Sequence, residues 1–331
     1  SFVEYDDPAS GFADGVAPPR FSNGYFQLRN RVGILVETHS WKDYPTRVRI
    51  TRNAIVDLVE MAAGDGAGWL AAEQAADRRS SQLAGKPVAL DFKATDKART
   101  IDFLGYAWTR TPSDISGALM THYDESKPEV WKIPLRGEVV PALAVTAPRG
   151  GYLVPAAWAS LVEPKLQLHG IKYRRLDAPL EAAAVETFRV EKPKFDAASF
   201  EGHQRATLDG QWSRGTRDLG AGALFVPIAQ PEARLAMALL EPQAPDSLAA
   251  WGETNNAFEQ KEYMEDYVAE DVARELLADD PALKSEFEKK LQDDPGFAKD
   301  AAARLDFFYR RSPSWDAGYG LYPVLRTDAV P

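Results

Sequence analysis

The hydrophobic pattern near the N-terminus predicts a buried strand that leads into ionisable residues. Residues 1–30 are rich in Gly, Pro, Asp and Asn, which is typical of a long loop. The nearly continuous apolar run Val32–Val36 follows and ends in Glu37-Thr38-His39. Such a strand carries ionisable groups to the edge of a sheet, where the ligands of open α/β sheets bind.

A helix is predicted after this strand. From Tyr44-Pro45 onward, apolar residues recur at three- and four-residue spacing, which favours an amphipathic helix. The glycines within Gly64–Gly68 interrupt or loosen it, and Trp69–Ser81 is again helical in pattern. Loop, strand and helix together predict one unit of an α/β sheet over residues 1–85.

The pattern changes over residues 86–228, where short β-prone segments are separated by Gly and Pro. Their spacing predicts a β-rich, antiparallel accessory region with an embedded α/β element. The expected strands are Val88–Phe92, Thr100–Thr109, Val130–Leu135, Ala142–Thr146, Ile171–Leu176, Thr187–Val190 and Ala223–Pro227, and the expected helix is Ala156–Leu168.

Residues 229–331 predict a helical C-terminal region. The expected helices are Glu232–Leu240, Glu259–Leu277 and Pro281–Leu291. The fold class predicted for the whole chain is therefore α/β plus β-rich, followed by helices. A length of 331 residues favours two or three domains.

Composition and charge narrow the class of partner. With 45% hydrophobic and 27% charged residues the chain is typical of soluble globular proteins. The formal net charge of -10 argues against a nucleic-acid partner. No apolar run approaches the roughly 20 residues of a membrane helix, so no membrane partner is expected. The absence of cysteine removes disulfide and thiolate chemistry and fits cytosol and periplasm equally.

Glu37 is the best candidate for a catalytic base. A carboxylate at a strand end, close in sequence to cations, has the chemistry to take a proton from a bound water. An ion-paired structural glutamate is an equal alternative. The neighbouring cations Arg29, Arg31, Arg47 and Arg49 either clamp a substrate carboxylate or pair with Asp43 and Asp57.

Two further patterns carry weaker signals. His122 and Glu125 have the His-x-x-Glu spacing that can chelate zinc, but without a third histidine at a matching position, chance occurrence is the better interpretation. His169 precedes Gly170 at the end of a predicted helix, where a histidine favours the helix dipole.

Aromatic residues are frequent in the last 80 residues. They include Trp251, Phe258, Tyr263, Tyr267, Phe307, Phe308, Tyr309, Trp315, Tyr319 and Tyr322. Packing of helices onto a neighbouring domain is favoured over a groove for glycan or peptide. A Gly-rich phosphate loop and a Gly-x-Ser-x-Gly elbow are both absent, which weakens nucleotide and serine-hydrolase interpretations.

Residues 21–40, FSNGYFQLRNRVGILVETHS, resemble the last catalytic segment of M14-family zinc carboxypeptidases. Residues 147–155, APRGGYLVP, and 239–248, LLEPQAPDSL, resemble the long C-terminal extension of large bacterial members. The resemblance implies that residues 1–85 end an M14-like α/β catalytic domain, followed by β-rich accessory regions and helices.

The resemblance also implies roles for single residues. Glu37 matches the family glutamate that activates zinc-bound water, Tyr25 is nearest to the mobile tyrosine, and Arg29 is a cation for the substrate's terminal carboxylate. The family's zinc ligands, a His-x-x-Glu pair and a later histidine, precede that glutamate, whereas no histidine precedes Glu37 here. We therefore assign no metal ligand in this chain and expect the zinc ligands in an N-terminal catalytic segment before Ser1.

The leading hypothesis is the C-terminal part of a zinc-dependent carboxypeptidase that acts on peptide substrates and is inactive as this isolated chain. The alternative is a non-catalytic peptide- or cell-wall-binding or assembly module on a peptidase-derived scaffold. A third hypothesis, an independent zinc hydrolase built on His122 and Glu125, is the weakest. The resemblance implies export to the periplasm or beyond.

Overall fold

The computed structural model describes residues 2–260 and 262–331. Its helices are η1 (Pro8–Ser10), α1 (Ser22–Leu28), α2 (Tyr44–Ser80), α3 (Ala156–Leu168), α4 (Ala233–Leu240), η2 (Asn255–Ala257), α5 (Asp266–Asp279), α6 (Pro281–Asp293), α7 (Pro295–Lys299) and α8 (Ala301–Tyr309). Its strands are β1 (Phe12–Ala13), β2 (Pro87–Ala94), β3 (Arg99–Pro112), β4 (Leu119–Arg136), β5 (Val139–Thr146), β6 (Gly151–Val154), β7 (Arg174–Arg175), β8 (Leu180–Phe195), β9 (Ala206–Leu219), β10 (Leu224–Pro227) and β11 (Leu325–Thr327).

The strands form three sheets. A long antiparallel hairpin, β3 and β4, is joined in parallel by the short β1, and β2 pairs with β5 as an antiparallel ribbon. The third sheet has the order β7-β10-β6-β11-β8-β9, so the last strand of the chain inserts between β6 and β8. The antiparallel pairing predicted for residues 86–228 is therefore confirmed.

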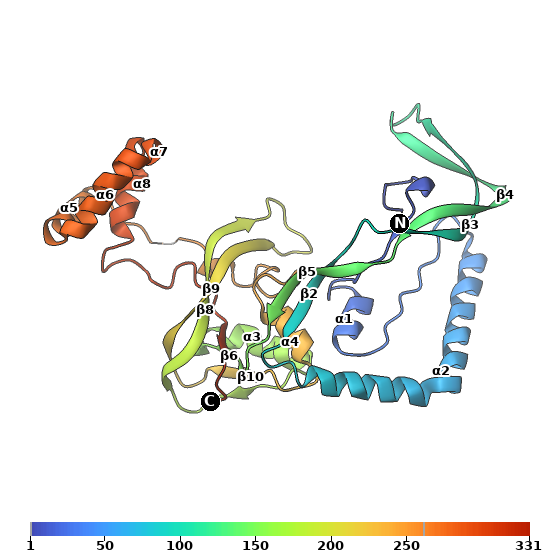
Figure 1. Ribbon diagram of the computed structural model, residues 1–331, viewed down its shortest axis with the longest axis horizontal. Coiled ribbons are helices and arrows are strands. Elements are labelled where there is room, and N and C mark those ends of the chain that lie inside the picture. The colour runs from blue at the N-terminus through green and yellow to red at the C-terminus, as the bar shows by residue number, and fades with distance from the viewer. Residues whose placement is uncertain (1, 261) are drawn as a thin grey trace.

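The main hydrophobic core lies where α3 and α4 cover one face of the six-stranded sheet. Tyr152 on β6, Phe188 on β8 and Leu240 on α4 are fully buried in it. A smaller cluster around Phe225 covers the other face of this sheet. Helices α5 to α8 bury Phe287, with other aromatic side chains, in a cluster of their own, and Figure 1 shows them set apart from the sheet.

Helix α2 is long and bent, and most of its residues are exposed. Asp65 leaves helical geometry, with φ -137° and ψ 26°, which confirms the interruption predicted at Gly64–Gly68. Figure 1 shows the two halves of α2 meeting at this bend. Ser80, at its last turn, is the helix's one buried residue.

The strand predicted at Val32–Val36 does not form. This segment has no regular secondary structure, and Val32, Ile34 and Leu35 are each more than half exposed. A strand requires hydrogen-bonding neighbours, and residues 31–41 have no paired strand within the described chain. The α/β unit predicted for residues 1–85 therefore lacks its strand here.

Other elements differ in their limits. Ser22-Asn23-Gly24, predicted as loop, begins α1, and the strand predicted over Ile171–Leu176 shrinks to the two residues of β7. The predicted helix Glu259–Leu277 begins at Asp266, while residue 261 lies outside the described residues. The helix predicted at Ala156–Leu168 is confirmed.

Candidate functional site

Two of the sequence-predicted substrate residues meet on α1. Tyr25 and Arg29 lie one helical turn apart, and the Arg29 Nη1 donates to the Tyr25 hydroxyl over 3.3 Å. The same Nη1 donates to the carbonyl of His169 over 2.5 Å, and the Tyr25 hydroxyl lies 3.1 Å from the His169 Nδ1. The side chains of α1 are thereby joined to the end of α3.

The surroundings of His169 disfavour its charged form. It is the C-cap of α3, and Gly170 follows in the left-handed region with φ 65°, as the sequence predicted. Burial lowers the pKa of His169 below 6.5, and the positive charges of Arg29 and Lys165 lower it further. A neutral imidazole beside a phenol can accept or donate a proton at that contact.

Arg29→Met should raise the pKa of His169. The substitution keeps the apolar stem in place and removes the positive charge that disfavours imidazolium. An NMR titration of the imidazole resonances measures the shift, and His39 in the same sample serves as the internal control. An unchanged His169 pKa would mean that Arg29 does not contribute to it, which leaves burial and Lys165 as the causes.

A cavity of about 390 Å³ opens beside this cluster. Tyr25, His169, His203 and Trp251 line it. Its rim carries two ion pairs, Arg20 with Asp246 and Lys165 with Glu253, each with an N to O distance of 2.8 Å. Aromatic walls with several hydrogen-bonding groups are typical of ligand pockets.

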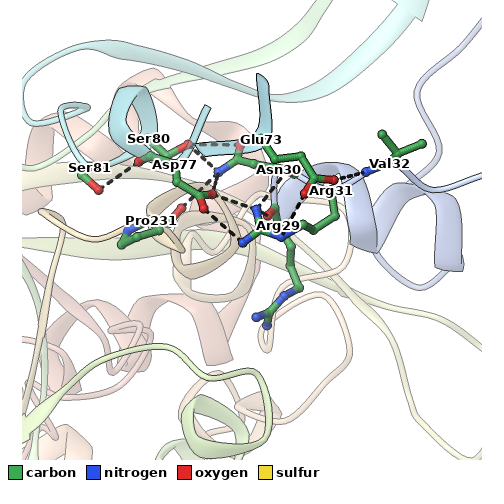
Figure 2. A network of polar contacts seen from close by, with 9 residues as sticks. All are labelled: Arg29, Asn30, Arg31, Val32, Glu73, Asp77, Ser80, Ser81 and Pro231. Atoms are coloured by element: carbon green, nitrogen blue, oxygen red, sulfur yellow. Dashed lines mark hydrogen bonds and ion pairs between the residues drawn. The ribbon is translucent and has the colours of Figure 1, made fainter. Parts of the chain in front are cut away.

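A polar network holds the chain where it leaves α1 (Figure 2). Asn30 has a φ of 57°, a left-handed conformation that asparagine tolerates. Its side-chain amide donates over 3.0 Å to Asp77 and over 3.0 Å to Ser80, both on α2. The backbone N–H of Val32 donates to the Glu73 carboxylate over 3.2 Å. The start of the exposed segment is therefore fixed to α2.

Arg31 strengthens this anchor through a two-pronged pair with Asp77. Its Nη1 and Nη2 each lie 3.0 Å from one carboxylate oxygen. The hydrogen bond from Arg31 is the largest cause that lowers the pKa of Asp77, and the same bond raises the pKa of Arg31. Both groups are partly exposed, so the pair contributes modestly to stability.

Asp77→Asn should lower stability at neutral pH by about 0.5–1 kcal/mol. Because folding lowers the Asp77 pKa, its contribution is present above the unfolded pKa of roughly 4 and is lost as the pH falls through the lower folded value. Urea unfolding at several pH values measures the difference, with the exposed Asp57→Asn on the same helix as control. A difference that persists at pH 2 would contradict this account.

Glu37 lies away from these contacts. It is exposed in the segment after Arg31 and forms no salt bridge within the described residues. The cations expected around it are used elsewhere: Arg31 pairs with Asp77, and Arg47 lies over the ring of Tyr44 at 5.9 Å. The alternative of an ion-paired structural glutamate therefore gains no support.

His122 and Glu125 lie on β4, and they gain no third metal ligand. Glu125 accepts a hydrogen bond from Lys42 over 2.7 Å. Within the described residues, no group of three or more His, Asp or Glu side chains is arranged to hold a metal ion. In the same part of the chain, no helix is long and apolar enough to cross a membrane.

Two contacts of the candidate residues could not be predicted from the sequence. The pattern at His169 indicates helix capping alone, whereas the side chain also contacts Tyr25, and no pattern near Arg31 indicates its ion pair with Asp77. The partners lie 144 and 46 residues apart, so no local pattern indicates either contact.

Part of the chain is related in sequence to fungal carboxypeptidases. It is 31% identical over 112 residues to carboxypeptidase 2 of Trichophyton rubrum, and 33% identical over 115 residues to carboxypeptidase 2 of Trichophyton tonsurans. Each match covers 34% of this chain and 20% and 21%, respectively, of the relative, so the chain spans about a fifth of their length. No family model matches the chain, and no solved structure matches it.

Proposed function

We propose that this chain is the C-terminal part of a zinc-dependent carboxypeptidase of the M14 type, which hydrolyses peptide bonds at substrate C-termini. The partial relationship to carboxypeptidases supports a peptidase-related function. The observation that carries the finer proposal is the exposed apolar segment that runs into Glu37. The assignment of residues 1–85 to the end of a catalytic domain stays a prediction.

The segment Val32–Val36 has the apolar composition of a buried strand, but its side chains are exposed in the structure. The exposed fraction is 55% for Val32 and Ile34 and 53% for Leu35. Burying a side chain of this size is worth about 1.5–3 kcal/mol, so leaving several exposed in series is unfavourable. A sheet supplied by other residues of the catalytic domain would pair with the segment and cover these side chains.

Helix α2 supports the same proposal from a second element. Eight large hydrophobic side chains on it are exposed: Tyr44, Val48, Ile50, Ile55, Val56, Val59, Met61 and Leu70. Surface helices normally bury their apolar residues. We propose that α2 and the segment before Glu37 face the same further part of the catalytic domain. The two are held together because Arg31 pairs with Asp77 and the backbone N–H of Val32 donates to Glu73.

The proposed roles follow from the side chains. Glu37, once paired into a sheet, accepts a proton from the attacking water and passes it to the leaving amine. Within the described residues, Arg29 makes its hydrogen bonds through Nη1, which leaves Nε and Nη2 for the substrate's terminal carboxylate. Figure 2 shows its guanidinium turned away from Asp77. Tyr25 lies beside it.

The described residues do not fit a zinc site, because they hold no group of three ligands. In the proposal the zinc ligands therefore belong to residues outside this sequence, and the 331 residues alone have negligible peptidase activity. The chain's own contributions are the base Glu37 and the cluster of Tyr25 and Arg29.

The first test is to read the coding sequence upstream of Ser1. The proposal expects a His-x-x-Glu pair followed by a further histidine. A reading frame without these ligands would overturn it and favour a non-catalytic binding module. Zinc-dependent release of C-terminal amino acids by the 331 residues alone would contradict the assignment of the ligands.

A further inference from the structure

A second and larger cavity, of about 520 Å³, lies far along the chain from the proposed catalytic residues. Four segments form it: the start of α3, the end of β9, the chain around η2, and the chain that follows α8. None of the residues proposed for carboxypeptidase chemistry lines this cavity. Its role is therefore a separate question.

Aromatic side chains build the walls of this cavity. Trp158 contributes from α3, while Tyr309, Trp315 and Tyr319 come from the C-terminal chain. The ring of Trp315 meets Tyr309 edge-on at 5.1 Å and Tyr319 edge-on at 5.5 Å. Such edge-to-face packing fixes the ring orientations. Trp158, Trp315 and Tyr319 remain partly exposed, so the cavity offers them to a ligand.

The backbone around these rings is held in place before any ligand binds. Arg189 donates to the carbonyls of Tyr319 and Ala317 over 2.8 and 3.1 Å. The N–H of Gly320 donates to Ala257 over 2.9 Å, which joins the aromatic segment to η2. A wall fixed in this way loses little entropy on binding.

The cavity is acidic as well as aromatic. Four carboxylates line it, from Asp218, Glu259, Glu262 and Asp316, against one cation from Arg217 among the described residues. Glu259 and Glu262 make no hydrogen bond or ion pair through their side chains within the part of the chain described. Carboxylates beside aromatic faces attract cations and disfavour anionic ligands.

The chain itself shows that one of these rings accepts a cation. The guanidinium of Arg310 lies over the indole of Trp315, at 5.0 Å from the ring centroid. An arginine or lysine of another molecule would find aromatic faces of the same kind together with carboxylates. The formal charge of -10 favours the approach of such a ligand.

We propose that this cavity binds a peptide segment bearing arginine or lysine side chains. The aromatic walls receive the cationic groups and their alkyl stems, and Glu259 and Glu262 supply the opposite charges. The proposal does not depend on carboxypeptidase activity, because it concerns a cavity that the proposed catalytic residues do not reach.

The test is isothermal titration calorimetry of this chain with a tetraarginine peptide, acetylated and amidated so that it carries no terminal charge. We expect one site per chain and weaker binding at high salt. The neutral tetracitrulline peptide, of nearly the same shape, should not bind measurably. The double variant Glu259→Gln with Glu262→Gln should weaken binding about three- to tenfold, as expected for two exposed charge pairs.

Two further variants separate this site from general attraction to an acidic protein. Glu275→Gln with Glu288→Gln makes the same change in net charge at exposed positions on α5 and α6 and should alter affinity by less than about twofold. Trp315→Leu should weaken binding about two- to fivefold. Equal weakening by the control pair, equal binding of tetracitrulline, or binding of an N-acetylglucosamine tetramer without binding of tetraarginine would overturn the proposal.

Discussion

Glu37→Gln in the complete protein should lower kcat for release of C-terminal amino acids by about 10²–10⁴-fold. Glutamine keeps the size of the side chain but cannot accept a proton from water. The value of KM should change little, because the carboxylate acts in the transition state rather than in substrate binding. Steady-state kinetics on a blocked dipeptide measures both constants.

Glu60→Gln is the matched control for this variant. Glu60 is exposed on α2 and has no proposed role in the chemistry. Its substitution by glutamine changes the net charge by the same amount as Glu37→Gln. It should leave kcat and KM within about twofold of the parent values. A Glu37→Gln enzyme with parental kcat would show that Glu37 is not the base, whatever the reaction.

The largest effect on stability is expected at a buried ion pair between Glu241, the C-cap residue of α4, and Arg326 on β11 of the six-stranded sheet. Glu241 is 1% exposed and accepts hydrogen bonds from the Tyr152 hydroxyl over 2.6 Å and from the Arg326 Nε over 2.9 Å. The Arg326 guanidinium also lies 3.8 Å from the centroid of Trp212. Burial raises the pKa of Tyr152, and the neighbouring negative charge of Glu241 raises it further.

Glu241→Ala should therefore lower the free energy of unfolding by about 3 kcal/mol, because it removes the hydrogen-bonded carboxylate beside a buried arginine and leaves Arg326 only the longer contact with Glu186, at 3.7 Å. Urea unfolding followed by circular dichroism measures the loss. Asp102→Ala removes an acid from the exposed pair with Lys132 and should cost at most about 1 kcal/mol. Similar losses of unfolding free energy in the two variants would show that the buried ion pair contributes no more to stability than the exposed one.

The sequence predicted those elements whose pattern is local. The helix from Tyr44 and its interruption near Gly64 depend on spacing and on glycine, and both are present in α2. Strands β3 and β4 are consecutive in the chain and pair with each other, whereas β2 and β5 pair across the β3–β4 hairpin, and local alternation still located the strand segments. Ser22-Asn23-Gly24 predicts a loop because Ser, Asn and Gly are frequent in turns, yet these residues begin α1 in the structure.

Non-local contacts explain what the sequence did not predict. Val32–Val36 has the pattern of a buried strand, but a strand depends on partners, and the described chain provides none. Arg31 forms its ion pair with Asp77 on α2 rather than with the acidic residues nearer in sequence. The aromatic residues of the last helices divide between two roles: Phe307 and Phe308 pack among helices, whereas Trp315 lines a cavity.

The most direct test of the central proposal is the carboxypeptidase activity of the full-length protein from the gene that encodes these 331 residues. The account predicts release of C-terminal amino acids from blocked dipeptides, lost on treatment with a zinc chelator and restored by added zinc. A complete, folded protein that binds peptides but releases no C-terminal amino acid at any zinc concentration would contradict it.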